Sequence, residues 1–487
     1  MTRRPYWQWQ GHVLNPRGWF RALRAWQRLS APALFLLSFL FLIAVGTAGL
    51  MLLPGLQAKE KLSFIDALFT MTSAVCVTGL AVADTATQFT RAGQAWILVF
   101  IQLGGIGALT LSTMIIGALG RRLSLRSEML TLAPPRREDQ PEVWQVARDI
   151  ARFTLAVEAI GAVVLFGLWL PLFDVDDAAW HALFHAISAY CNAGFSTFSD
   201  NLVGFADRPL SLVVISVLVI VGGLGFLTFE ELLRWWKASR TRRDGLRIRL
   251  SGSRRLSSHT WAVVITTLAL LLGGWLLFAF FEWSDSLGHL ATGDRVANAW
   301  FMSVTARTAG FNSIDYGAIG NDSATLTMLL MFVGGSPGST AGGIKTSTLA
   351  VLVALGVSRV RGRSFVGLKD RAIPERTIEA TVGIILLSML VLVTSCFVLS
   401  AVESAGAAAL ETRTQFLPNV FEVVSALSTT GLSMNLTPRL ADGAKLVLVM
   451  LMFIGRVGLL SFFAAVTLRR AQPPAFRRPA QEDVIVG

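Results

Sequence analysis

The feature that most constrains the fold is a short apolar segment that recurs four times along the 487 residues. In each copy an aromatic residue stands ten positions before a glycine, and Leu or Phe follows that glycine. The copies are FTMTSAVCVTGL (69–80), FHAISAYCNAGF (184–195), WFMSVTARTAGF (300–311) and FEVVSALSTTGL (421–432). Successive glycines are 115, 116 and 121 residues apart, so the sequence predicts four copies of one structural unit.

Long apolar segments flank each copy. Only 15% of the residues are charged, against roughly 25% in soluble domains, and stretches such as 33–53 can cross a hydrocarbon core of about 30 Å as helices. That first stretch is too long for a secretory signal and lacks a small-residue cleavage pattern. We expect an integral membrane protein whose long helices form pairs at 31–53 and 93–118, 146–172 and 209–236, 257–282 and 324–357, and 377–402 and 443–468.

The positive charges are distributed unevenly among the loops. Of the 43 Lys and Arg residues, 29 fall in the segments 1–30, 121–137, 237–255, 359–376 and 469–478, and only eight fall in the loops on the opposite side. The positive-inside rule then places both termini in the cytoplasm. This pattern explains the net charge of +12 without nucleic acid; the basic segments face solvent and lipid headgroups or dock a cytoplasmic partner.

Each short segment has too few residues to span the membrane. With this topology it must enter from outside and return, as a pore helix of about ten residues followed by a glycine turn. Irregular backbone at membrane depth is tolerated where protein buries it or where it lines a watery path. The expected fold is an all-α integral membrane protein with four helix–pore-loop–helix repeats in a pseudo-fourfold ring around one central ion pore. Ordinary amphipathic helices under outer loops would explain one such glycine, but not four.

The predicted organisation follows from these segments. We expect a basic cytoplasmic arm at 1–30, repeat 1 at 31–120, a cytoplasmic loop at 121–142, repeat 2 at 143–236, a basic cytoplasmic loop at 237–256, repeat 3 at 257–357, a cytoplasmic loop at 358–376, repeat 4 at 377–470 and a cytoplasmic tail at 471–487.

A ring of backbone carbonyls can replace the hydration shell of a cation, and glycine allows the backbone conformation that such a ring needs. The predicted K⁺ filter uses the carbonyls of Val77, Thr78, Gly79, Asn192, Ala193, Gly194, Thr308, Ala309, Gly310, Thr429, Thr430 and Gly431. Its side chains differ between the copies, so we expect weaker selectivity than in a symmetric filter. The outer aspartates Asp84, Asp200, Asp207, Asp315 and Asp322 either keep the loops soluble or concentrate cations.

The stretch GGSPGSTAGGIKTST (334–348) interrupts the second long helix of repeat 3, on the cytoplasmic side of the filter. It does not fit a nucleotide-binding P-loop, because Ile344 stands at the lysine position. An anion site made of its backbone N–H groups is the alternative. We expect a gating loop, with the gate formed by Gly334, Gly335, Ser336, Pro337, Gly338, Ser339, Thr340, Ala341, Gly342, Gly343, Lys345 and Arg456.

Three cationic side chains lie in apolar surroundings, where an uncompensated charge is costly. Arg456 should face the interior and pair with backbone carbonyls, either as a positive barrier below the filter or as a packing residue. Lys345 either reaches the cytoplasmic interface or contacts the loop. Arg307, three residues before a filter glycine, is expected to brace the filter without touching the cation.

The sequence contains few residue groupings of the kind found in enzyme active sites and metal sites. The three cysteines are scattered, and His181 and His185 lack a third ligand nearby, which favours a structural role. No nucleophile, base and orienting group occur together. An enzyme and a non-conducting scaffold are therefore weaker hypotheses than an ion pathway.

The segments SAVCVTGL, NAGF, ARTAGFNSID, GGSPGSTAGGIKT and FIGRVG resemble the Trk, Ktr and HKT superfamily of potassium transporters over about residues 31–470. The short basic arm before the first span favours the KtrB-type pore subunit. The resemblance implies potassium uptake across the bacterial inner membrane, with sodium as an open option for an activator and no organic cofactor on this chain. It also implies a homodimer of pore subunits under a cytoplasmic ring of RCK domains that binds ATP or ADP. An anion channel that uses the glycine-rich loop remains the alternative.

Overall fold

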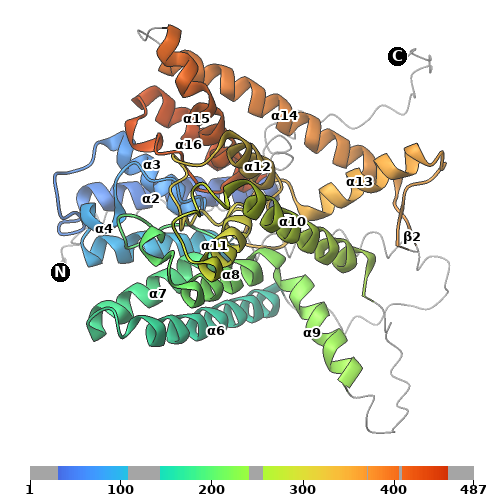
Figure 1. Cartoon of the computed structure of the whole chain (residues 1–487), viewed down its shortest axis with the longest axis horizontal. Coiled ribbons are helices and arrows are strands. Elements are labelled where there is room, and N and C mark those ends of the chain that lie inside the picture. The colour runs from blue at the N-terminus through green and yellow to red at the C-terminus, as the bar shows by residue number, and fades with distance from the viewer. Residues whose placement is uncertain (1–30, 108–142, 241–255, 370, 405–408, 459–487) are drawn as a thin grey trace, which may run out of the picture.

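The computed structural model describes residues 31–107, 143–240, 256–369, 371–404 and 409–458, and these are mostly helical (Figure 1). A short hairpin of β1 (Gly367–Leu368) and β2 (Arg371–Ala372) pairs antiparallel. The predicted arm at 1–30, the loop at 121–142, residues 241–255 of the loop at 237–256 and the tail at 471–487 lie outside the described residues.

The first long helix of each predicted pair is confirmed to within three residues. These helices are α2 (Ala31–Leu52), α6 (Val143–Trp169), α10 (Ser258–Glu282) and α14 (Glu375–Glu403). Each contains a stretch long and apolar enough to cross a membrane. Within the described ranges these are the four single helices with that property, and a fifth span is possible if a bent pair is counted.

The second long helix is broken more often than the sequence predicted. A helix runs over 91–107, and the others are α8 (Pro209–Leu224), α9 (Phe226–Arg240), α12 (Asn321–Phe332), α13 (Thr346–Val360) and α16 (Asp442–Val457). The prediction of one helix over 209–236 is wrong, because α8 and α9 meet at 101° around Gly225. The predicted ends at 118 and 468 lie beyond the described residues.

The interruption between α12 and α13 is confirmed. It is shorter than predicted at its far end, because α13 begins at Thr346 and residues 346–348 are helical. We call residues 333–345 the glycine-rich loop.

The four short helices are longer than the ten residues expected. They are α3 (Phe64–Val75), α7 (Val175–Cys191), α11 (Thr292–Thr305) and α15 (Ala409–Ser428). Each extends further upstream than the recurring segment; α3, for example, begins after Ser63, whose hydroxyl caps the N–H of Asp66 at 3.1 Å. The smaller elements are α4 (Thr85–Gln88), η2 (Val203–Phe205) and η4 (Thr437–Arg439).

The recurring aromatic residues anchor the short helices in the core. Phe69, Phe184 and Phe421 are fully buried, and Trp300 is partly buried and meets Trp275 edge-on at 5.8 Å between ring centroids. Burying an aromatic ring contributes about 1.5–3 kcal/mol. The aromatic position thus fixes each short helix against the long helices around it.

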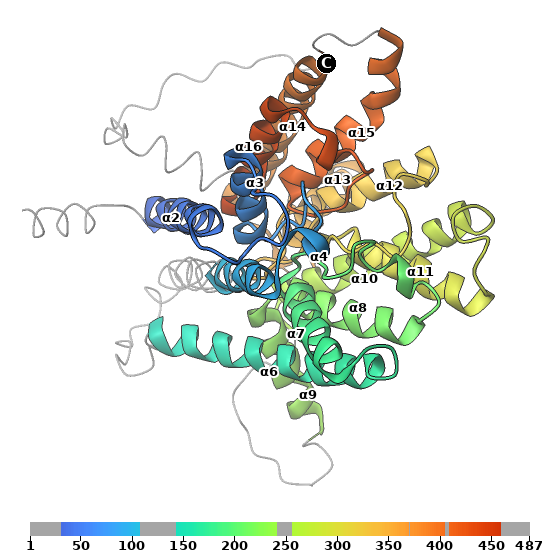
Figure 2. The same ribbon diagram turned by 90° about the vertical axis from the view of Figure 1, so that its left-hand side faces the viewer.

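Successive parts of the chain follow one another around the centre of the molecule (Figure 2). Helix α8 packs on α11, α12 on α15, and α16 on α3, so the last part of the chain returns to the first. At one rim, hydrogen bonds join the same neighbours in turn: Ser199 to Asp84 (2.7 Å), Leu202 to Asn312 (3.0 Å), Asn435 to Asp315 (2.8 Å) and Lys445 to Asp66 (2.7 Å).

Candidate functional site

Four segments with one glycine each meet at the centre, and we call 77–79, 192–194, 308–310 and 429–431 the glycine segments. A Cβ atom built on each glycine would collide with the middle carbonyl oxygen of the next segment. The distances from the built Cβ to the carbonyl oxygen are 2.5 Å for Gly79 and Ala193, 2.8 Å for Gly194 and Ala309, 2.5 Å for Gly310 and Thr430, and 2.1 Å for Gly431 and Thr78. The fourth contact returns to the first segment, so these contacts form a closed cycle.

The backbone of every glycine segment has the same unusual alternation. The first residue has positive φ in all four: Val77 (55°), Asn192 (60°), Thr308 (67°) and Thr429 (51°). The closing glycines have φ of 99°, 70°, 79° and 94°, while the middle residues are not in the left-handed region. Positive φ is uncommon outside glycine. The shared pattern indicates that all four glycine segments adopt one backbone conformation.

A hydroxyl near the end of each short helix holds the turn that follows it. Ser73 and Ser425 accept hydrogen bonds from the N–H of Gly79 and Gly431, both at 3.0 Å. Ser188 and Thr305 instead donate to the carbonyls of Phe195 and Phe311, at 2.8 and 2.5 Å. These residues were not predicted from the sequence, although a serine stands six positions before the glycine in three of the four copies.

The second long helices approach these turns through glycines that were also overlooked. A Cβ on Gly104, Gly222 or Gly455 would lie 2.0–2.1 Å from the carbonyl oxygen of Val75, Tyr190 or Leu427, respectively. Each of those carbonyls belongs to the end of a short helix. The signal is present in the sequence as GGIG (104–107), GGLG (222–225) and GRVG (455–458), and Arg456 occupies the position that is glycine in the other two.

The glycine-rich loop forms its own hydrogen-bonded base. The N–H of Gly334 donates to Ile344 O at 3.0 Å, and the N–H of Ile344 donates to Phe332 O at 3.2 Å. Two further amides, of Ser336 and Thr340, donate to the carbonyls of Gly223 and Gly222 at 2.9 and 3.3 Å. The loop therefore leaves α12, packs against the end of α8 and returns beside its own starting point.

The loop lies against the first residue of three glycine segments. The Thr340 hydroxyl donates to Asn192 Oδ1 at 3.0 Å. A Cβ on Gly342 would lie 1.9 Å from the Thr429 hydroxyl, and one on Gly334 would lie 2.9 Å from the Thr308 methyl group. The loop thus covers one end of the ring that the glycine segments form.

Three cationic side chains hold carbonyl oxygens of this loop. Arg307 donates from Nη2 to Gly334 O at 2.9 Å, and Lys345 donates from Nζ to Ala341 O at 2.7 Å. Arg456 donates to Thr340 O, and also to Gly104 O at 3.0 Å. The expectation of carbonyl partners for Arg456 is confirmed, and for Lys345 the structure favours the loop over the interface.

The remaining candidate residues make contacts within their own loops, besides the links of Asp84 to Ser199 and of Asp315 to Asn435 described above. Asp84 caps α4 through the N–H of Ala86 at 2.9 Å; Asp200 and Asp315 likewise accept from amides of their own loops. His185 contacts Ser196 at 2.9 Å and His181 contacts Thr197 at 2.6 Å. In the described part of the chain, no group of three His, Cys, Asp or Glu residues is placed to hold a metal.

Comparison with known proteins agrees with this geometry. The model of the TrkH family, described as cation transport protein, matches residues 27–475. The Ktr system potassium uptake protein B of Vibrio alginolyticus is 36% identical over 94% of this chain and 95% of its own length. The potassium/sodium uptake protein NtpJ of Enterococcus hirae is 32% identical, covering 95% and 99%.

A solved structure shares the fold. The crystal structure of the potassium transporter TrkH from Vibrio parahaemolyticus superposes with a TM-score of 0.68 over 90% of this chain and 86% of that one, at 21% identity. The resemblance to a KtrB-type subunit is confirmed, and these relatives are membrane transporters rather than enzymes. The chain belongs to the TrkH family of cation transport proteins.

Proposed function

We propose that this protein carries potassium into the bacterial cell through a path enclosed by the four glycine segments. The observation that carries the proposal is the closed cycle in which each glycine admits a carbonyl of the next segment. The names of the similar proteins support the choice of ion: the one from Vibrio alginolyticus is a potassium uptake protein and the one from Enterococcus hirae a potassium/sodium uptake protein. The four helix–pore-loop–helix repeats then surround one pore with pseudo-fourfold symmetry.

The chemistry of the glycine segments suits a dehydrated cation. Their carbonyl oxygens supply the ligands that replace water. The buried hydroxyls of Thr78, Thr308, Thr429 and Thr430 have no hydrogen-bond partner within the described residues. Buried polar groups normally have a partner, and a cation on the axis gives these oxygens one.

The unequal side chains of the four segments bear on selectivity. The relative from Enterococcus hirae is a potassium/sodium uptake protein, so sodium belongs among the ions to be tested as competitor and as activator. We expect potassium to be preferred, with less discrimination than a filter of four identical segments would have. If the positions of the carbonyl oxygens differ between the four segments, the ring discriminates less strongly between ions of different radius.

We propose that the glycine-rich loop is the gate. It covers the cytoplasmic end of the ring and is held by Arg307, Lys345 and Arg456 through its carbonyls. Its release is assigned to a cytoplasmic partner, since relatives are named as parts of a Ktr system. We infer a homodimer under a nucleotide-binding RCK ring, in the inner membrane, with both termini in the cytoplasm.

The alternative of an anion channel has less support. It needs free N–H groups in the glycine-rich loop. The amides of Gly334, Ser336 and Thr340 instead donate to carbonyls. These amides are not available to an anion, and the similar proteins are named for cation uptake; chloride flux is the second measurement if potassium flux is absent.

The deciding experiment is ⁸⁶Rb⁺ uptake into liposomes that hold the purified protein, driven by trapped K⁺. External K⁺, Na⁺ and choline are the competitors. We expect K⁺ to compete best and choline not at all. Uptake that none of the cations reduces, or no uptake even from a protein without residues 336–343 and with its partner present, would overturn the proposal.

A further inference from the structure

The guanidinium of Arg307 is buried without an acidic partner. Only 8% of the residue is exposed, and among the described residues no carboxylate lies within ion-pair distance of it. Its Nη2 reaches Gly334 O, while Nε has no hydrogen-bond partner. A buried charge without a counter-ion is strongly unfavourable, because the lost hydration is not replaced.

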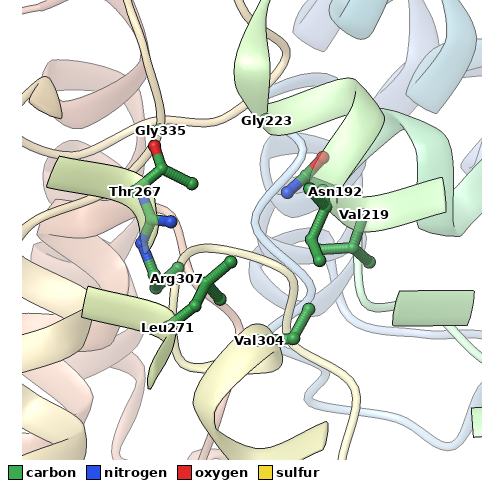
Figure 3. A pocket seen from close by; sticks show the side chains of 9 residues that line it. Asn192, Val219, Gly223, Thr267, Leu271, Val304, Arg307 and Gly335 are labelled. Carbon is green, nitrogen blue, oxygen red and sulfur yellow. The ribbon is translucent and has the colours of Figure 1, made fainter. Parts of the chain in front are cut away.

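A small cavity of about 20 Å³ lies beside this side chain. Figure 3 shows Arg307 on one side of it and Asn192 on the other. Thr267, 5% exposed, also lines the cavity, and its hydroxyl lacks a partner. The rest of the wall is mainly apolar, from Val219, Ile220, Leu271 and Val304. A volume of roughly 10–15 Å³ on this measure admits one water-sized particle, so the cavity holds a single small occupant.

The polar groups around the cavity are chiefly donors. Arg307 can only donate, and the Thr267 hydroxyl is free to do so. The Asn192 oxygen already accepts from Thr340 at 3.0 Å, which leaves its NH₂ group on the cavity side (Figure 3). No carboxylate lines the space. This set of donors matches a monatomic anion better than a cation.

We propose that this cavity binds one halide ion of chloride size, which neutralises Arg307 behind the glycine segment 308–310. Arg307 directly precedes that segment, and Asn192 opens the segment 192–194. An uncompensated positive charge at this place would repel a cation in the ring, and the halide removes that repulsion. The bound ion stays in the wall and is not transported. Its effect on potassium rests on the proposed function, but its binding does not.

Binding can be observed directly with bromide. Crystals of the full-length protein are grown in sodium bromide and in sodium gluconate, whose anion is too large for the cavity. We expect an anomalous difference peak between Arg307, Thr267 and Asn192 in bromide. A cavity that contains only water in bromide crystals overturns the proposal.

A matched pair of variants tests the donors in solution. Thr267→Val removes one hydroxyl at nearly constant size, whereas Thr266→Val makes the same change at a half-exposed neighbour that does not line the cavity. Thermal stability is titrated with bromide at constant ionic strength. Loss of one hydrogen bond should weaken the apparent bromide affinity of Thr267→Val about tenfold and leave Thr266→Val unchanged. Equal titrations of the two variants contradict the site.

The functional effect has its own readout. Replacing chloride by gluconate should reduce ⁸⁶Rb⁺ uptake by the unaltered protein, and restoring chloride should recover it. If bromide binds but the rate of ⁸⁶Rb⁺ uptake is the same in chloride and in gluconate, the proposed electrostatic role of the halide is overturned. If bromide binds and no cation is transported under any condition, the proposed function fails and the halide site stands.

Discussion

Arg456 links two parts of the chain that are far apart in sequence. Its guanidinium donates to Thr340 O in the glycine-rich loop and to Gly104 O on the helix over 91–107. Hydrogen bonds from a charged donor contribute about 1.5–3 kcal/mol each. Arg456 thus places a positive charge beside the glycine-rich loop and connects the loop to the helix over 91–107 through hydrogen bonds.

Replacing Arg456 should therefore favour release of the loop. For Arg456→Gln we expect basal ⁸⁶Rb⁺ uptake without the partner to rise about 30-fold, as a loss of about 2 kcal/mol from the closed state implies. Arg295→Gln is the control, since Arg295 also donates to carbonyls, at Leu290, Trp283 and Gly288, but far from the loop. Equal basal uptake by Arg456→Gln and the unaltered protein would remove Arg456 from the gate.

The glycine of each segment leaves no room for a side chain. In Gly310→Ala the new methyl group would meet Thr430 O at 2.5 Å, with φ at 79°. We expect the protein to fold and ⁸⁶Rb⁺ uptake to fall at least tenfold, because the displaced carbonyl no longer completes the ion cage. Gly383→Ala, in open space on α14, is the control. Normal uptake by Gly310→Ala would exclude this segment from the ion path.

At the scale of elements, the glycine-rich loop can be removed without separating its helices. Gly334 and Ile344 are already hydrogen-bonded to each other, so a chain that lacks residues 336–343 can close across that base. Arg456 loses its carbonyl partner at Thr340, and Lys345 loses those at Ala341 and Gly342. Arg307 keeps its partner, because Gly334 remains. The deletion thus tests whether the glycine-rich loop blocks the ion path, with little change to α12 and α13.

For the 336–343 deletion we expect basal ⁸⁶Rb⁺ uptake to rise without any partner and to become insensitive to it. The measurement is made beside size-exclusion elution and thermal unfolding, which should show a folded protein. A folded deletion variant with the same basal uptake as the full chain would mean that another element is the main barrier.

The elements also show which parts of the site the sequence could predict. The interruption between α12 and α13 was predictable, because Pro337 and five glycines break a helix locally. The break at Gly225 was not, since it depends on a distant segment: a Cβ there would lie 2.8 Å from Gly338 O. Likewise the four glycines of the ring were found by their repetition, whereas the carbonyls they admit belong to neighbouring segments and are visible only in the fold.

At the scale of the whole molecule, the orientation in the membrane was predicted from charge alone. Its test uses Cys396→Ala, which leaves the buried Cys76 and Cys191 as the native thiols. An impermeant thiol reagent added to intact cells should label Arg439→Cys, in an exposed position of η4, and not Arg363→Cys, exposed between α13 and β1. Labelling of Arg363→Cys alone would reverse the orientation.

The closed ring leaves room for one loop beneath it, and Gly334, Thr340 and Gly342 of that loop already contact three of the four glycine segments. Four identical subunits would each bring such a loop, and three of them would have no place to pack. A single glycine-rich loop beneath the ring therefore suits a chain in which the four quarters lie in one polypeptide and differ in sequence. On the function proposed above, a ring whose four quarters lie in one polypeptide can place the obstructing loop in one quarter and ion ligands in all four.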